Sequence, residues 1–576
     1  MPRRLLLYII CIIATGLQRE AVAADINMVK AAVAVPPAWS WTGFYGGVHL
    51  SAGAGTANFA DPFGSSIFGD NVFTPGFLAG GQIGYNWQTP NSNLVLGIEG
   101  DASWLISDGT NTCLAFSGFF VSGNCHAQPN FMGDLTARVG WAYGLYNHSL
   151  IYVKGGAAVI HNQIDIATNN TPLFGLAPLT TSSVFTEVGW TVGAGVEHAI
   201  TPTWSVKLEY NYAGFGGEAV ATPPGIVQPA PPALLYFLTS PSTAHVTQNF
   251  QEVSLGLNYK FGVAPSTQWG SASMAVLPGA PVPVIAAGWE FELGARDWVS
   301  SGRFQKDAGS TTDPGTSTTL NSRLTYDTTA NSAELFGRIE APQNIFLKGN
   351  IGAGWISSGQ LNDEDWGLPF GITVVPYSNT TSSVSGDIGY ATGDVGYDFF
   401  RGIGYRLGAF VGYNYYAENK SAYGCTQIAN GFSDCVPAIE YSVLGITEND
   451  TWNSLRVGLN GAVMVTDRLK VEADVAYLPY VAFKGTDDHL LRNLTIQESG
   501  TGMGVQLESI LSYFVTDQLS VGVGGRYWAM WTTNNAIVDP NGAPCPCQTQ
   551  PAKTDRFGVF VQLDYTGLGS LFGRFN

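Results

Sequence analysis

The chain has little charge, few cysteines and no long apolar run beyond its first 24 residues. Charged residues make up 12 % of its 576 residues, about half the share found in soluble domains. No later apolar run reaches the roughly 18 residues that a membrane-spanning helix needs. A hydrophobic content of 45 % argues against a disordered chain, and a net charge of −18 argues against nucleic acid as a partner.

Residues 1–24 have the organisation of a secretory signal peptide. Two arginines precede the apolar core 5–13, and Ala21-Val22-Ala23 form a small-residue cleavage site. Cleavage would leave six cysteines in an exported chain. We expect disulfide bonds within the local pairs Cys113/Cys125 and Cys425/Cys435, because an oxidising compartment permits them. Cys545 and Cys547 are too close for an unstrained bond, and their state stays open.

What the chain does contain is glycine, aromatic residues and alternating strands. Gly (71), Phe (31) and Tyr (25) are abundant, and tight turns alternate with long loops, as in outer-membrane barrels. Residues 38–262 are expected to form eight strands, near 41–55, 76–88, 93–105, 131–145, 149–165, 183–200, 203–216 and 247–262. This part resembles the small porin-family outer-membrane proteins of α-proteobacteria, through Trp41–Gly47 and Gly256–Phe261. The resemblance implies a role in envelope structure.

Histidine is scarce, and six of the seven lie in the first 262 residues. None of these six has the spacing of metal ligands, and we expect them to be solvated loop or turn residues. They are His49, His126, His148, His161, His198 and His245.

A proline-containing linker, 263–287, precedes a second alternating series. Residues 288–576 are expected to form ten strands: 288–305, 317–340, 345–358, 381–401, 404–422, 438–465, 468–485, 494–515, 518–535 and 555–567. The predicted fold class is therefore all-β, with two tandem antiparallel transmembrane β-barrels. Charged residues on the inward faces should fill each lumen, because barrels of this size leave little open bore; they include Lys470, Glu472, Asp474 and Arg526. We assign Tyr415, Tyr416, Trp528 and Trp531 to an interface girdle.

Two acidic tips stand out in the second series. Asp363 and Asp365 lie in the predicted loop 359–380, and Asp487 and His489 lie in the loop 486–493. An even strand number places both loops at the same, external end. A histidine oriented by a carboxylate can act as a general base on water, and a second pair of carboxylates can hold that water from the other side. His489 is the one histidine of this half.

These residues carry a resemblance to the omptins, ten-stranded outer-membrane endopeptidases. An Asp-x-Asp-Trp motif after the third strand matches Asp363, Asp365 and Trp366, and an Asp-x-His tip after the seventh matches Asp487 and His489. The resemblance implies that Asp487 orients His489, that His489 activates water, and that the aspartate pair positions it. It implies polypeptide substrates at the cell surface, an outer-membrane lipid or lipopolysaccharide environment, and no metal or other cofactor.

Three positions depart from the family pattern. Where omptins that prefer basic residues carry an acid two residues before the catalytic aspartate, this chain has Gly485. The other specificity acid falls on Lys306 or Asp307, depending on where a gap is placed. The lipopolysaccharide-contacting motif appears as Tyr413–Ala417, without its charged residues.

Continuing the alternation of the strand 468–485 points Asp487 and His489 outwards. A bulge at Gly485 or at Pro479 would re-aim them. Two other functions stay open at this stage: a non-catalytic structural or adhesive envelope protein, with the acidic tips as a solvated rim that binds cations opportunistically, and a small pore.

Overall fold

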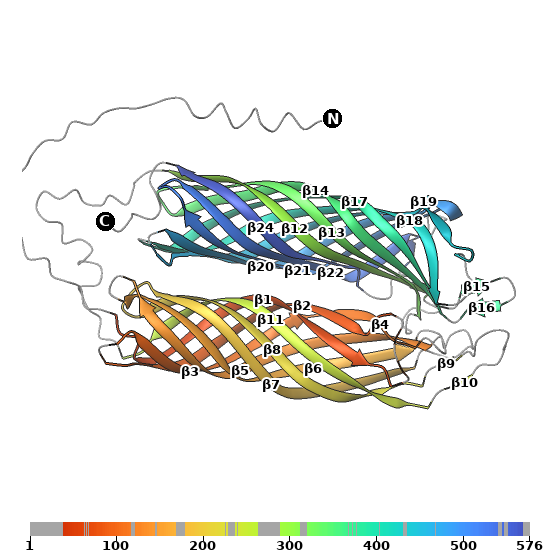
Figure 1. Cartoon of the computed structure of the whole chain (residues 1–576), viewed down its shortest axis with the longest axis horizontal. Helices are drawn as coiled ribbons and strands as arrows, with labels where there is room; N and C mark the ends of the chain where they lie inside the picture. The colour runs from red at the N-terminus through yellow and green to blue at the C-terminus, as the bar shows by residue number, and fades with distance from the viewer. Residues whose placement is uncertain are drawn as a thin grey trace, which may run out of the picture. The chain divides into compact units, whose positions relative to one another are not determined.

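In a computed structural model of the chain, nearly all the described residues belong to β-strands. The structure describes residues 39–262 and 289–567, apart from short internal segments of which the longest are 169–178, 228–236 and 311–318. No helix in these ranges is long and apolar enough to cross a membrane. The strands form two antiparallel sheets that each return to their first strand (Figure 1).

The first sheet is a ring of eight strands, closed by the pairing of β3 with β5. The ring consists of β1 (Gly43–Ala60), β2 (Asn71–Gln88), β3 (Leu94–Ser107), β5 (Val121–Tyr143), β6 (Ser149–Thr168), β7 (Thr180–Ala199), β8 (Trp204–Thr222) and β11 (Ser242–Lys260). A ninth strand, β4 (Gly109–Phe116), pairs with the upper part of β5. A short hairpin, β9 (Ile226–Val227) and β10 (Phe237–Leu238), lies between β8 and β11.

The second sheet is a ring of ten strands, closed by the pairing of β21 with β22. Its strands are β12 (Glu290–Ser310), β13 (Thr319–Glu340), β14 (Ile345–Asp365), β17 (Ser378–Gly402), β18 (Tyr405–Ala429), β19 (Ile439–Met464), β20 (Leu469–His489), β21 (Leu494–Phe514), β22 (Leu519–Val538) and β24 (Lys553–Gly567). The hairpin β15 (Leu368–Phe370) and β16 (Thr373–Val375) follows β14, and β23 (Pro544–Cys545) pairs with β22. Both strand numbers agree with the prediction.

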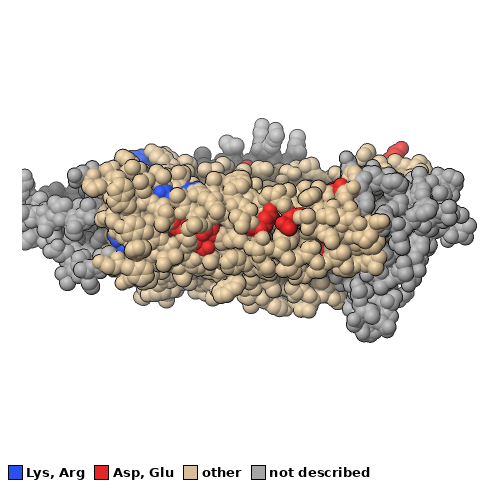
Figure 2. Space-filling view, turned by 90° about the horizontal axis from the view of Figure 1, so that it is seen from below, with Lys and Arg blue, Asp and Glu red and all other residues tan. Residues whose placement is uncertain are grey.

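The alternation of side chains explains why these sequences form barrels. Along β24, Phe557, Val559 and Val561 are exposed, whereas the alternate residues Arg556, Phe560 and Gln562 are buried. An apolar outer wall and a polar, filled lumen are typical of membrane barrels. One long side of the molecule is covered almost entirely by uncharged residues, with acidic and basic side chains only as isolated groups (Figure 2).

Several sequence predictions can be compared directly with the structure. The disulfides Cys113–Cys125 and Cys425–Cys435 are both present, as predicted. Lys470, Glu472, Asp474 and Arg526 do face the lumen of the second ring, where each forms an ion pair. The signal peptide 1–24 and the whole linker 263–287 lie outside the described residues, as do Cys547 and the side chain of Cys545.

Two predictions about aromatic and histidine residues are wrong. Tyr416 and Trp528 do not belong to an outer girdle, because they are buried in an aromatic cluster inside the second ring. Trp531 lies on the opposite face of β22 from Trp528, and Tyr415 is exposed. The six histidines are not all loop residues. His49 lies on β1, buried between Gln82 and Ser103, because strand alternation directs its side chain inward.

Candidate functional site

The four candidate residues lie at the ends of two strands of the second ring, not in the loops that the sequence predicted. Strand β14 continues through Asp363 and Asp365, and β20 continues through Asp487 to His489. The large apolar side chains exposed on β14 end at Trp355, and the last one on β20 is Tyr480. A membrane crossing takes only about 9–11 residues of a strand. The candidate residues therefore lie beyond the apolar belt.

A bulge in β20 aims Asp487 and His489 into the barrel. Leu478 and Pro479 together oppose one residue of β19, between the pairs Val457–Tyr477 and Leu455–Tyr480. The register with β21 shifts at the same place, between Leu478 and Val481. Before the bulge the even-numbered residues face inward, and after it the odd-numbered residues do, because one extra residue exchanges the two faces of a strand. The expected bulge is thus located at Pro479, and not at Gly485.

Strand β14 contains a second bulge that does the same for the aspartate pair. Its register with β13 shifts between Thr329 and Ala330, and its register with β17 shifts after Ile356. Ile356 is buried before the shift and Leu361 after it, both in the interior cluster. Asp363 and Asp365 follow Leu361 on the inward face. Glu364, on the other face, accepts a hydrogen bond from the Tyr377 hydroxyl at 2.6 Å.

Asp487 and His489 form a hydrogen-bonded dyad. The Nε2 atom of His489 lies 3.0 Å from Oδ2 of Asp487, which is buried. Burial alone would raise the pKa of Asp487, but the ammonium of Lys306 and the ring of His489 outweigh burial and lower the pKa to about 2. An ionised carboxylate only accepts hydrogen bonds, so Nε2 is the donor and the basic lone pair of the neutral ring is on Nδ1.

The electrostatic environment makes His489 a stronger base. Burial lowers the pKa of the imidazole, but the hydrogen bond and negative charge of Asp487, with the charge of Asp363, raise it above its ordinary value of 6.5. In the ring of ten strands, β14 is separated from β20 by the three strands β17, β18 and β19, so that the two strand ends lie on different sides of the opening.

The aspartate pair holds a proton at neutral pH. Burial and then repulsion from Asp363 raise the pKa of Asp365 to about 8, and burial also raises the pKa of Asp363, against the attraction of His489. Two carboxylates on one face of a strand cannot both ionise easily. Arg492, in the short 3-10 turn Leu490–Arg492 after His489, attracts both aspartates.

The sequence pointed to Lys306 or Asp307 as a specificity position, but it did not show that Lys306 lies beneath the dyad together with Glu448 and Glu498. Lys306 points into the barrel from β12 and places its Nζ 2.8 Å from Oδ2 of Asp487, 2.5 Å from Glu448 and 2.8 Å from Glu498. Its neighbour Asp307 points the other way and binds Arg323 at 2.7 Å. Among the residues described, these three acids are the one group of His, Cys, Asp or Glu with metal-like spacing, and an ammonium lies among them.

Gly485 leaves room for acids from the two neighbouring strands. A Cβ at this position would lie 3.1 Å from Oε2 of Glu498 on β21 and 3.2 Å from Oδ1 of Asp450 on β19, the two residues that pair with it. Asp450 in turn forms a buried ion pair with Lys420. Gly485 itself has no carboxylate, but those of Asp450 and Glu498 lie next to it. Each of these two carboxylates is paired with a lysine of this chain, Lys420 and Lys306.

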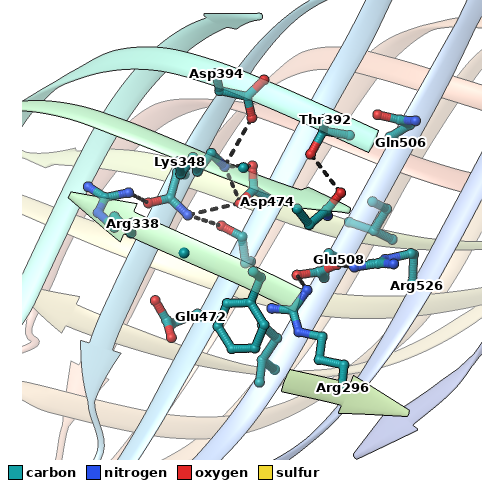
Figure 3. Close-up of a pocket in the computed structure, with 18 of the residues that line it drawn as sticks. Arg296, Arg338, Lys348, Thr392, Asp394, Glu472, Asp474, Gln506, Glu508 and Arg526 are labelled. Carbon is teal, nitrogen blue, oxygen red and sulfur yellow. Dashed lines mark hydrogen bonds and ion pairs between the residues drawn. The ribbon is translucent and has the colours of Figure 1, made fainter. Parts of the chain in front are cut away.

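Aromatic side chains and ion pairs close the barrel below the site. Phe483 packs on Trp452 with ring centroids 4.4 Å apart and lies 6.1 Å from Phe304. Farther down, a cavity of about 100 Å³ is crossed by ion pairs (Figure 3). In it Lys348 lies 2.5 Å from Asp474, and Arg526 lies 2.6 Å from Glu508. These ion pairs fill the lumen below the aromatic side chains with polar contacts.

Comparison with known proteins finds a family match in each half. Residues 28–261 match the outer membrane protein beta-barrel domain, and residues 331–537 match the omptin family. The second match contains all four candidate residues, whereas Lys306 lies outside it. The 31 kDa outer-membrane immunogenic protein of Brucella melitensis is 33 % identical over 264 residues, which are 44 % of this chain and 98 % of that protein.

Two further proteins are each similar to part of the chain. The 22 kDa outer membrane protein of Rhizobium leguminosarum bv. viciae is 34 % identical over 31 % of this chain and 67 % of its own length. Among solved structures, the outer membrane protease OmpT from Escherichia coli aligns with 48 % of this chain and 97 % of its own, at 17 % identity and a TM-score of 0.39.

Proposed function

Because the chain belongs to the outer-membrane β-barrel protein family through its first half and has an omptin-family domain in its second, it is an integral outer-membrane protein, and we propose that its second barrel is a surface endopeptidase. The first barrel has a structural role in the envelope. The observation that carries the proposal is the convergence, at one end of one barrel, of the Asp487–His489 dyad and the pair Asp363/Asp365.

The geometry supports a water-mediated cleavage of the peptide bond. His489 takes a proton from water on Nδ1 while the water oxygen forms a bond to the carbonyl carbon, and Asp487 balances the charge on the ring. Asp365, which keeps its proton at neutral pH, donates a hydrogen bond to the developing oxyanion. The C–N bond then breaks, and the leaving amine takes the proton from His489.

The test is cleavage of a mixed peptide library by the full chain, refolded with and without lipopolysaccharide. His489→Ala is the matched variant, because His489 is only partly buried and its loss should leave the barrel folded. Cleavage by the parent and not by the variant would support the proposal. Equal inactivity of two folded proteins would contradict it and favour a non-catalytic structural or adhesive protein. Ion conductance in planar bilayers would identify a pore instead.

A further inference from the structure

Lys306 is a strand residue whose ammonium lies in the middle of an acidic site. Strand β12 is not paired with β19, β20 or β21, yet its lysine contacts one carboxylate from each of these three strands. The ammonium donates a hydrogen bond to Oε1 of Glu498 at 2.8 Å and lies at ion-pair distance from the other two carboxylates. The side chain therefore crosses the lumen and closes the floor beneath the dyad.

The carboxylates around it form a site that is suited to a cation. Oxygen atoms of Glu448, Asp487 and Glu498 all lie within 4.8 Å of one another. Oδ1 of Asp487 and Oε2 of Glu498 are buried and have no hydrogen-bond partner within the described part of the chain. Buried carboxylates need a counter-charge, because the cost of their desolvation is otherwise uncompensated. Lys306 supplies that charge from within the chain.

We infer that Lys306 is a built-in cation that occupies the acidic subsite beside the dyad, so that the proposed peptidase accepts an uncharged side chain there and excludes lysine and arginine. The inference rests on the proposed function and specifies its substrate class. A basic substrate side chain would meet three carboxylates that already share the charge of Lys306, and it would be repelled by the ammonium. Lys306 is thus a specificity-determining residue, and it also positions Asp487 through the same oxygen that contacts His489.

Two substitutions separate the charge of Lys306 from the space it fills. Lys306→Ala removes both and leaves three carboxylates around a cavity the length of a propylammonium ion. Lys306→Met removes the charge but keeps the cavity filled, because methionine has a similar length and adapts to irregular gaps. The alanine variant should bind cations, and the methionine variant should not.

The first measurement does not depend on cleavage. Thermal unfolding of the full chain is followed while n-propylammonium is titrated, with n-propanol as the neutral control of the same size. We expect a saturable rise in Tm of about 5 °C or more for Lys306→Ala, and no such rise for the parent, for Lys306→Met or with propanol. If Lys306→Ala does not fold alone, it should fold when propylammonium is present. Absence of any amine effect on the alanine variant would overturn the inference.

The second measurement uses the peptide library. The parent should cut next to uncharged residues, and Lys306→Ala should raise the ratio of cuts next to Arg or Lys by about tenfold, which corresponds to 1.4 kcal/mol. A parent that prefers Arg or Lys would overturn the inference even if the amine binds. If no variant cleaves any peptide while the amine still stabilises the alanine variant, the endopeptidase and its substrate class fail, and the built-in cation remains established.

Discussion

The two barrels differ in the side chains that fill the end at which β1 of the first barrel and β14 and β20 of the second barrel end. In the first, the ends of the ring strands and β4 enclose an apolar cluster that includes Phe59, Val72, Ile164 and Val246. In the second, the corresponding strand ends carry Asp363, Asp365, Asp487 and His489 above an aromatic floor. Both have charged lumens lower down. What differs is whether charge continues to the opening.

The lumen of the first barrel contains a network of paired charges. Glu99 lies 3.0 Å from Nζ of Lys207 and accepts a hydrogen bond from Tyr45 at 2.8 Å, and Lys154 lies 2.8 Å from Glu209. Here carboxylates lie close to cations. At the opening of the second barrel carboxylates outnumber cations, and a proton must be held by the pair Asp363/Asp365.

The largest expected effect comes from removing the extra residue of the β20 bulge. Deleting Pro479 restores a single alternation along β20, so that Asp487 and His489 turn to the outer wall. Cleavage should fall to the level of His489→Ala while the barrel still forms. The measurement is library cleavage, together with heat-modifiable migration in gels as a check of folding. A folded deletion variant with parental activity would show that the bulge does not set the site.

Asp487→Asn should reduce the cleavage rate roughly 10³-fold. An amide does not stabilise the charged imidazole or fix its tautomer as an ionised carboxylate does. Asp488→Asn is the matched control, because Asp488 lies next in the same strand but on the other face, where it accepts a hydrogen bond from Thr495. Rates are compared on one peptide at saturating concentration. Similar losses in both variants would point to a general effect of charge at the rim.

In the first barrel, a carboxylate removed from the lumen should affect stability and not cleavage. Glu99→Gln leaves Lys207 and its neighbours without their shared counter-charge and should lower the free energy of unfolding by about 3–5 kcal/mol. The exposed Glu218→Gln should have little effect. Urea unfolding in detergent micelles gives the first quantity, and cleavage by the folded fraction gives the second. A specific loss of cleavage would mean that the first barrel takes part in the reaction.

The smallest effects concern pH. Because the active form of His489 is neutral and its pKa is raised above 6.5, the rate should increase as pH rises through a value above 6.5. It should decrease again near pH 8, where Asp365 loses its proton. The asparagine of Asp365→Asn cannot ionise, so the alkaline decrease should disappear at a lower overall rate.

Glu498 provides the control for this assignment, since burial also raises its pKa to about 8. If Glu498→Gln abolishes the alkaline decrease and Asp365→Asn does not, the proton that is lost near pH 8 belongs to Glu498 and not to the aspartate pair.

The fold was predictable because period-two alternation and turn lengths are local properties of the sequence. They correctly predicted eight and ten strands and placed both acidic tips at the same end of the second barrel. Strand ends were less predictable: β14 and β20 extend through segments assigned to loops, because pairing with neighbouring long strands continues beyond the membrane.

Of the site residues, the sequence identified those in two short motifs, Asp363/Asp365 and Asp487/His489. Glu448, Glu498 and Lys306 are single charged residues in three separate strands, and nothing local shows that their side chains meet. Their contact depends on the register between strands and on which face each residue occupies. The prediction for Tyr416 and Trp528 was wrong for the same reason. The sequence around an aromatic residue does not show which face of the strand it occupies.

The pair of bulges also governs how such barrels can be recombined. Each bulge adds one residue to its strand. Whether the acidic residues at the strand end face inward therefore depends on whether an odd or an even number of residues separates them from the apolar belt. Exchange of whole upper segments with another barrel will therefore preserve the chemistry only when parity is conserved in β14 and β20 together. Loop length, by contrast, is free to vary.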